Sequence, residues 1–156
     1  MRTIDGNPAA SGLRVAIVVS KYHDFVTDRL QGGSLAALDA AGVARDGITI
    51  VRVPGSFELP SAARHAAEGG RYDAVVCLGC LIKGETPHFE VIASAVAHGL
   101  TAAAAATGVP MTFGVLTTNS VEEALARAGD GPDNKGWEAA AAAVELATIV
   151  RQLRQP

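Results

Sequence analysis

Ala74-Val-Val-Cys-Leu-Gly-Cys-Leu-Ile82 runs directly into Lys83-Gly-Glu-Thr-Pro-His-Phe-Glu90. The first nine residues are almost all apolar, which is typical of a strand buried on both faces of a sheet. A glycine turn follows, and an apolar, alanine-rich stretch then predicts a helix at 87–107. A buried strand that leads through a short turn into a helix favours a parallel sheet.

The same alternation of strands and helices extends along the chain. Strands are predicted at 13–19, 48–53, 74–82 and 110–116, and helices at 24–41, 57–68, 87–107, 120–128 and 133–153. We therefore predict one flavodoxin-like α/β domain: a doubly wound, four-stranded parallel sheet with helices on both faces. Residues 1–12 contain Gly, Pro and Ser without periodicity, and are expected to form a flexible N-terminal arm before a domain at 13–156.

Composition limits the class of protein. The 156 residues include 49% hydrophobic and 19% charged residues, and the mean hydropathy is +0.24. This is apolar for a monomer, so part of the surface is expected to be buried against other subunits. The formal charge is −3 and no basic stripe occurs, so we expect no nucleic-acid partner. No signal peptide and no apolar run near the roughly 20 residues of a membrane span is recognised, so a cytoplasmic protein is expected.

The turn after the third strand has the features of an anion site. Thr86 is a good helix N-cap and Pro87 suits the first helical position. The first free N–H groups of the helix would then point back at the turn, where His88 also lies. An anion site beside an imidazole suggests chemistry on a phosphorylated substrate, although a lone histidine at a helix start is more often structural.

Cys77 and Cys80 form a C-x-x-C pair inside the predicted strand. Their odd separation places the two sulfur atoms on opposite faces of the strand, so they are expected not to bridge. Redox pairs of this kind lie at a helix N-terminus instead, and no second cysteine pair or histidine cluster completes a zinc site. We therefore expect two buried structural cysteines and no metal.

The candidate site residues fall into two groups. Tyr22, Ser56-Phe57-Glu58 and 82–88 all follow strand ends, so they should gather at one edge of the sheet. Phe113 lies partway along the fourth strand, and Arg127 lies roughly 10 Å down the next helix at 1.5 Å per residue. If these two serve the same site, they come from a neighbouring subunit.

Four segments together resemble the 6,7-dimethyl-8-ribityllumazine synthase family, which acts in riboflavin biosynthesis. They are Gly84-Glu-Thr-Pro-His-Phe89, Val53-Pro-Gly-Ser-Phe-Glu-Leu-Pro60, Phe113-Gly-Val-Leu-Thr-Thr118, and Arg127-Ala-Gly129 with Asn134-Lys-Gly136. They occur in the family's order, and the resemblance extends from Leu13 to Leu153.

The resemblance implies an enzyme, a transferase. It would condense 5-amino-6-(D-ribitylamino)uracil with 3,4-dihydroxy-2-butanone 4-phosphate to give 6,7-dimethyl-8-ribityllumazine, phosphate and water. It implies no metal or organic cofactor, and the chain has no Walker A or G-x-G-x-x-G motif for a nucleotide. His88 would be the general acid and base. The implied substrate-binding set is Tyr22, Ser56, Phe57, Glu58, Cys80, Leu81, Ile82, Glu85, Thr86, Phe113, Arg127 and Lys135.

The same resemblance assigns roles at the two ends of the site. Tyr22 would stack on the pyrimidine, Ser56 and Glu58 would hold the ribityl chain, and residues 80–82 would contact the uracil through their main chain. At the other end, Glu85 and Thr86 would bind the phosphate.

Three residues would complete the site. Arg127 would neutralise the phosphate, Lys135 would assist it or order the Arg127 loop, and Phe113 would close the site from the next subunit. The expected assembly is a homopentamer or an icosahedral sixty-mer of such pentamers, with riboflavin synthase as a further candidate partner.

The chain departs from the family pattern at several positions. Tyr22-His23 stands where Phe-Asn is common, Ser56 where Ala is common, and Lys83 where Arg is common. Ligand contact by His23 is left open. A non-catalytic lumazine- or flavin-binding protein, or a shell-forming protein on the same scaffold, is the alternative function. Retention of both His88 and Arg127 favours the enzyme.

Overall fold

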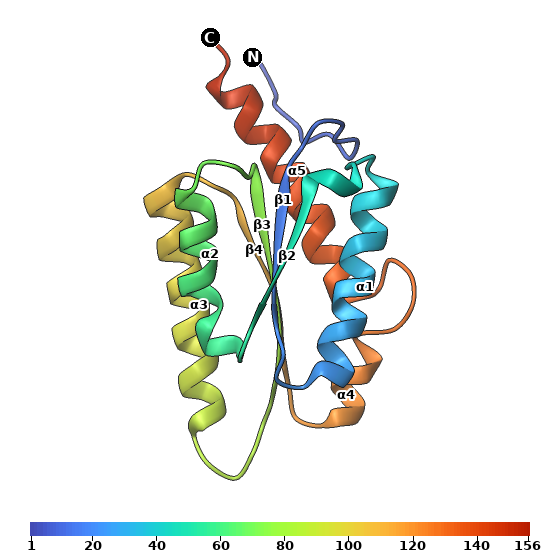
Figure 1. The fold of residues 1–156 in the computed structure, drawn as a ribbon, viewed down its shortest axis with the longest axis vertical. Helices are drawn as coiled ribbons and strands as arrows, with labels where there is room; N and C mark the ends of the chain where they lie inside the picture. The colour runs from blue at the N-terminus through green and yellow to red at the C-terminus, as the bar shows by residue number, and fades with distance from the viewer.

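A computed structural model describes all residues from Met1 to Pro156 (Figure 1). Four strands alternate with five α-helices, and short 3-10 helices occupy Arg45–Gly47 and Ser56–Glu58. The elements in chain order are β1 (Val15–Ser20), α1 (Asp24–Ala40), β2 (Ile48–Val53), α2 (Leu59–Glu68), β3 (Ala74–Ile82), α3 (His88–Thr107), β4 (Met111–Thr118), α4 (Val121–Ala126) and α5 (Lys135–Arg154).

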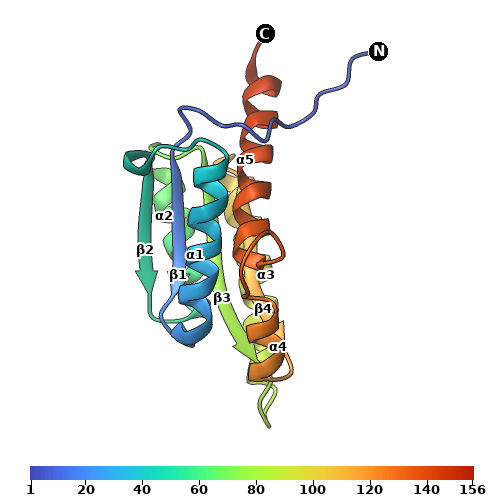
Figure 2. The ribbon, with the colours of Figure 1, turned by 90° about the vertical axis from the view of Figure 1, so that its right-hand side faces the viewer.

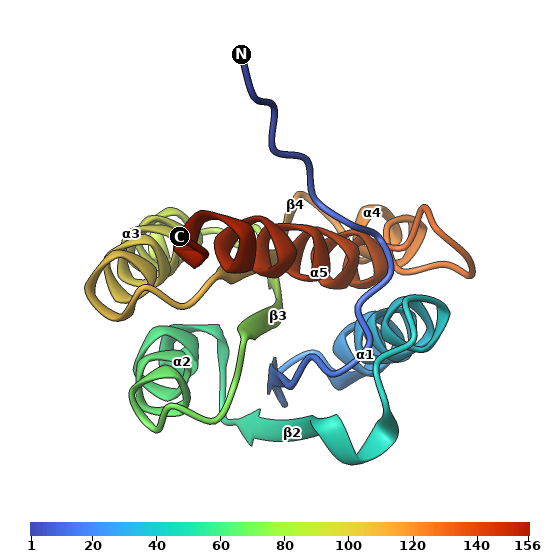
Figure 3. The ribbon, with the colours of Figure 1, turned by 90° about the horizontal axis from the view of Figure 1, so that it is seen from above.

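The strands form one parallel sheet in the order β2-β1-β3-β4. Helices α2 and α3 cover one face, and α1 and α5 cover the other (Figures 1 and 3). The predicted doubly wound, flavodoxin-like α/β fold is therefore confirmed. The strand order reverses between β1 and β3, and this is the place where such sheets bind ligands.

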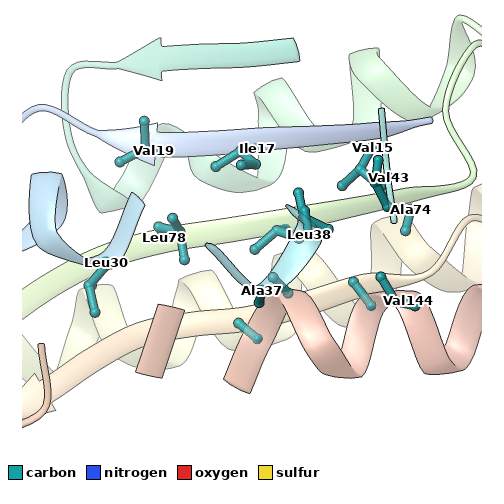
Figure 4. Packing of buried hydrophobic residues seen from close by; sticks show 14 of the residues in the cluster. Val15, Ile17, Val19, Leu30, Ala37, Leu38, Val43, Ala74, Leu78 and Val144 are labelled. Carbon is teal, nitrogen blue, oxygen red and sulfur yellow. The ribbon is translucent and has the colours of Figure 1, made fainter. Parts of the chain in front are cut away.

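Two apolar cores lie on either side of the sheet. Alternate residues of β1 and β3 supply each core, because side chains of a strand point to opposite faces. On the α1–α5 side, Val15, Ile17 and Val19 pack with Leu30 and Leu38 of α1 (Figure 4). On the other side, the smaller core includes side chains of α2 and α3. Both central strands are thus buried on both faces, as their apolar runs predicted.

Strand β3 is longer than its neighbour β1. Pairing between them ends at Val19 and Leu78, whereas β3 and β4 remain paired up to Ile82 and Thr118. The last four residues of β3 (Gly79–Ile82), here called the β3 overhang, therefore extend beyond β1 at the carboxyl edge of the sheet (Figure 2). Chain termini lie at the opposite end of the molecule (Figure 1).

Several predicted boundaries need correction. Strand β1 is shifted to Val15–Ser20, and β4 is extended to Thr118 rather than ending at 116. Helix α2 is preceded by the 3-10 turn, and α5 begins at Lys135 rather than 133. The reason is that strand ends depend on the pairing register, and helix ends on cap geometry.

The short helix α4 also differs at both ends from its prediction. It ends at Ala126 instead of 128. Ser120-Val-Glu-Glu123 has the sequence pattern of a capping box, and half of that box forms. The Ser120 hydroxyl accepts the Glu123 N–H at 3.1 Å, but the Glu123 carboxylate accepts from Asn119 N rather than from Ser120 N.

Helix α3 corrects the expectation that no apolar run reaches membrane-spanning length. Its 20 residues have a window of mean hydropathy 1.4, long and apolar enough by length and composition to cross a membrane. One such helix is weak evidence for a span, and Val96, Leu100 and Ala103 of α3 pack into the domain core. Only 17% of the window is buried, because many of its alanines face outward. The helix therefore presents an apolar outer surface.

The N-terminal arm, residues 1–12, contains no helix or strand. It nevertheless contacts the body of the domain. The N–H of Asn7 donates to Thr148 Oγ1 at 2.7 Å, Gln152 Nε2 donates to the Asp5 carbonyl at 2.7 Å, and Ala10 is buried. Asp5 and Asn7 thus contact α5, which the arm crosses in Figure 2, while flexibility of the arm remains a prediction.

Asn134 and Gly136 hold the start of α5 close to α1. The buried Asn134 side chain accepts from Gly136 N at 2.7 Å and from Trp137 N at 3.1 Å. Its Nδ2 donates to the Arg29 carbonyl at 3.1 Å and to the Gly129 carbonyl at 2.8 Å. A Cβ on Gly136 would collide with the Leu30 backbone. The helices can approach this closely only because residue 136 has no side chain.

Replacing Gly136 by Ala should therefore destabilise the protein by about 1–3 kcal/mol, the usual cost of overpacking. The matched control is Gly32→Ala in α1, where an added Cβ meets nothing within 4 Å. That change should stabilise the helix by about 0.5–1 kcal/mol. Urea unfolding of both variants measures the two shifts, and equal midpoints would contradict the close packing of α5 on α1.

Candidate functional site

An open cavity of about 750 Å³ lies at the carboxyl edge of the sheet. Its walls come from the segments that follow three strands: Tyr22 and His23 after β1, residues 54–58 after β2, and residues of the β3–α3 region. These segments meet because parallel strands place their carboxyl ends at one edge. The expected gathering of strand-end residues therefore occurs.

The cavity combines aromatic and polar side chains. Tyr22 is 65% exposed and Phe57 is 62% exposed, so both present ring surface to solvent. Glu58 and His88 line the same cavity. A flat aromatic surface beside a carboxylate and an imidazole can bind a planar, polyhydroxylated ligand and exchange protons with it.

Ser56 forms part of the cavity floor. It is only 5% exposed, and its hydroxyl has no hydrogen-bond partner within the chain. A Cβ on Gly79 would collide with the Ser56 Oγ, so glycine in the β3 overhang is what allows the 3-10 turn to approach the strand. A buried hydroxyl without a partner is a position where a ligand or water can supply the missing hydrogen bond.

The start of α3 differs in detail from its prediction. Pro87 occupies the N-cap with φ −70° and ψ 4°, and no side chain caps the helix, so Thr86 is not the N-cap. The helix begins at His88, because the Pro87 carbonyl accepts the first helical bond from Val91 N at 3.2 Å. The N–H groups of the first turn lack intrahelical partners. The free N–H groups therefore begin one residue later than predicted, and anion binding at this terminus stays a prediction.

A second groove of about 620 Å³ runs along the free edge of β4. Phe113, Arg127 and Lys135 line it, together with residues of α5 that include Glu138. No residue is shared between this groove and the strand-end cavity. Within one chain, Phe113 and Arg127 therefore lie apart from Tyr22 and His88, as the chain spacing predicted.

The cations of this groove are held by local contacts. Arg127 Nη1 donates to the Glu123 carbonyl at 3.0 Å, and its own carbonyl accepts from Lys135 N at 2.9 Å. The Lys135 ammonium pairs with Glu138 at 2.9 Å. Both side chains are exposed or half-buried, so an anionic ligand can reach them. The Asn134 contacts described above fix the backbone from which both cations project.

Comparison with known proteins decides the family. The family model for 6,7-dimethyl-8-ribityllumazine synthase matches residues 12–151. A protein of that name from Desulfatibacillum aliphaticivorans is 41% identical over 98% of this chain and 99% of its own length. One from Nitratidesulfovibrio vulgaris (strain DP4) is 44% identical over 98% of both chains. A third, from Syntrophus aciditrophicus, is 45% identical over 96% of this chain and 97% of its own.

The chain belongs to the 6,7-dimethyl-8-ribityllumazine synthase family. The resemblance inferred from four short segments is thereby confirmed over nearly the whole chain. Membership in this enzyme family also disfavours the alternative of a purely non-catalytic scaffold.

The structure distributes the family's candidate residues over three places. One group lines the strand-end cavity: Tyr22, Ser56, Phe57, Glu58, Leu81, Ile82, Thr86 and His88. A second group, Phe113, Arg127 and Lys135, lines the β4 groove. Glu85 is exposed on the β3–α3 turn beside the cavity, and the side chain of Cys80 is buried in the core. Any ligand contact of Cys80 is therefore a main-chain contact.

The C-x-x-C pair behaves as the strand pattern predicted. Cys77 packs in the core beneath α2 and α3, whereas Cys80 packs in the core beneath α1 and α5. Both are free thiols. Burial raises the pKa of Cys77 to about 12 and that of Cys80 to about 11, so neither is a thiolate at neutral pH.

Two residues outside the predicted set contribute to these sites. Asn134 enters the sequence analysis only as part of a motif, because the predicted helix begins at 133 and contains it. An Asn is nevertheless a recognisable N-cap signal, which could have placed the helix start at Lys135. For His23, the sequence does not decide whether the side chain contacts a ligand. Its sequence signal was weak, because nothing local indicates the left-handed backbone that His23 adopts, with φ 59°.

Proposed function

We propose that this chain condenses 5-amino-6-(D-ribitylamino)uracil with 3,4-dihydroxy-2-butanone 4-phosphate to form 6,7-dimethyl-8-ribityllumazine, phosphate and water. The observation that carries the proposal is the strand-end cavity, which unites Tyr22, Glu58 and His88 in a chain of this family. Its volume of about 750 Å³ is adequate for small-molecule reactants.

The pyrimidine end of the site is formed by Tyr22, the Ser56–Glu58 turn and the β3 overhang. The exposed Tyr22 ring offers a stacking surface, and Glu58 accepts hydrogen bonds from ribityl hydroxyls. Val75 N donates to Pro110 O and Lys83 N to Thr118 O, so odd-numbered residues of β3 direct their N–H groups toward β4. Cys80 and Ile82 therefore direct their main-chain groups toward the side where β1 has ended.

The phosphate end lies at the start of α3. Its first N–H groups and the adjacent Glu85–Thr86 backbone can donate to phosphate oxygens, and the helix dipole favours the negative charge. Arg127 from an adjacent subunit would supply a planar fork that matches phosphate geometry. Lys135, which lines the same groove, adds a second cation.

His88 is the proposed proton-transfer group. Imine formation, phosphate elimination and ring closure each require a proton to be taken from carbon or nitrogen, or delivered to oxygen. An imidazole performs such transfers near neutral pH. His88 is the first residue of α3 and lines the cavity between the proposed pyrimidine and phosphate ends, so both reactants would be within its reach. Positioning of two bound reactants supplies much of the remaining acceleration.

A homo-oligomer with sites between subunits fits the separation of the cavity from the β4 groove. The groove holds Phe113, Arg127 and Lys135, which a cavity in another subunit lacks. The apolar outer surface of α3 can also form contacts between subunits. We propose a pentamer or a sixty-mer of pentamers in the cytoplasm, with riboflavin synthase as a candidate partner; light scattering separates the two assemblies.

Replacing His88 by Ala should lower turnover by about 10-fold to 1,000-fold, with little change in binding. General acid–base groups typically contribute about 100-fold to 10,000-fold, and the positioning of the reactants is retained in the variant. The measurement is lumazine formation by absorbance, with both substrates, across pH 6–8. Unchanged turnover over this range would remove His88 from the mechanism. Wild-type protein that forms no lumazine would reject the proposed function itself.

Replacing Arg127 by Ala should weaken use of the butanone phosphate by roughly 10-fold to 150-fold, because a charge-assisted hydrogen bond contributes about 1.5–3 kcal/mol. Arg127→Lys should recover only part of this loss, because lysine lacks the planar guanidinium fork. Calorimetric titration with inorganic phosphate and with a phosphate-free ribityl-pyrimidine analogue separates the two ends. Loss of the pyrimidine analogue with retained phosphate binding would reverse the proposed orientation.

Mixed oligomers test whether each site spans two subunits. Subunits carrying His88→Ala and subunits carrying Arg127→Ala are each expected to be poorly active alone. In co-expressed random mixtures, about a quarter of head-to-tail interfaces would pair an intact His88 with an intact Arg127. Activity above that of either parent is therefore expected. Without any such gain, His88 and Arg127 would have to act from the same chain.

A further inference from the structure

We propose that His23 is a specificity-determining residue of the pyrimidine subsite, where its neutral imidazole hydrogen-bonds the ligand through a free ring nitrogen. The inference rests on the proposed function, because it concerns the ligand of the same cavity. His23 lies outside the substrate-binding set described above, although it lines the cavity next to Tyr22.

The backbone of His23 is unusual. It has φ 59° and ψ 46°, and it is the one non-glycine residue in the left-handed region. It serves as the N-cap position of α1, and its carbonyl accepts from Val26 N at 2.9 Å and Thr27 N at 3.0 Å. Such conformations are uncommon outside glycine and concentrate at functional sites, with Asn, Asp and His tolerated best. This conformation places residue 23 at the cavity wall.

The imidazole ring is held by aromatic neighbours. Its centroid lies 4.3 Å from that of Tyr22 at an interplanar angle of 54°, and 5.6 Å from that of Phe25 at 84°. No protein group hydrogen-bonds a ring nitrogen of His23, whereas His65 and His98 each have Nδ1 2.8 Å from a helix carbonyl. An imidazole fixed by ring packing, with both nitrogens unused, is available to a ligand.

The charge state follows from the surroundings. The other titratable side chains of the cavity are Tyr22, Glu58 and His88, and Lys21 and Asp24 flank the residue in the chain. Partial burial is the cause that lowers the pKa of His23, with no opposing stabilisation from a carboxylate. The ring is therefore neutral at pH 7, where it has one donor and one acceptor nitrogen. The carbonyl groups of a pyrimidine edge can accept from the donor nitrogen, and its amino groups can donate to the acceptor nitrogen.

The pH dependence has a definite sign. A ligand that binds the neutral ring prefers the form populated above the pKa, so affinity is retained at high pH. This affinity is lost when the ring becomes protonated, as pH falls below the ordinary histidine range near 6.5. If the His23 ring only packed against Tyr22, no such loss of affinity at low pH would be expected.

Two variants separate hydrogen bonding from packing. His23→Asn keeps a polar side chain that tolerates the left-handed backbone, but it does not titrate. His23→Phe keeps the ring but has no nitrogen. The probe is a phosphate-free ribityl-pyrimidine analogue, titrated calorimetrically into wild type and both variants at pH 7.5 and 5.5. Inorganic phosphate serves as the control ligand, and thermal unfolding checks each fold.

We expect wild-type affinity for the analogue to fall by about 2-fold to 10-fold at pH 5.5, the range of one neutral hydrogen bond. His23→Phe should bind the analogue more weakly than wild type by a similar factor at pH 7.5. His23→Asn should lose less affinity than wild type between pH 7.5 and pH 5.5. Any pH effect that arises elsewhere in the cavity is common to all three proteins and cancels in the comparison. Phosphate binding should be equal in all.

Identical pH dependence in wild type and His23→Asn, or wild-type affinity in His23→Phe, would overturn the assignment and leave the proposed function intact. Wild type that neither binds the analogue nor forms lumazine would overturn both. If one substitution impairs folding, the comparison of wild type with the other variant still tests the proposal.

Discussion

The unequal length of two paired strands is the constraint on which the site depends. Strand β1 pairs with β3 only as far as Leu78, while β3 continues for four residues beside β4. Those residues form a wall above the end of β1, and the segments after β1 and β2 close the other sides. The cavity thus follows from a parallel sheet whose order reverses between β1 and β3.

Close backbone approaches keep this arrangement rigid. Gly79 lets the Ser56 turn lie against the β3 overhang, and Gly136 lets α5 lie against α1. Asn134 then joins the start of α5 to α1 and to the loop after α4 through four hydrogen bonds. The cations of the β4 groove project from this fixed loop. Both halves of the proposed site therefore stand on well-packed elements, although they lie on separate surfaces of one chain.

The proposed division of the site would cover three of the exposed aromatic rings. Tyr22, Phe57 and Phe113 are exposed large rings in a chain whose core is filled mainly by Val, Leu and Ala. Such rings are costly to leave in water unless a ligand or another subunit covers them. Their positions, two in the cavity and one in the groove, match a site that is completed when two copies meet.

The sequence by itself determined the fold class, the number of strands and their alternation with helices, the opposite faces of Cys77 and Cys80, and the family. These features rest on local signals: apolar runs, strand alternation, glycine turns and short motifs. It also separated Phe113 and Arg127 from Tyr22, because helix rise and strand position follow from residue counting. Only the tertiary structure decided the β3 overhang, the helix start at His88, the Asn134 contacts and the left-handed backbone of His23. Each of these depends on which distant segments pair or pack, and pairing register, cap geometry and close backbone contact leave no local trace in composition.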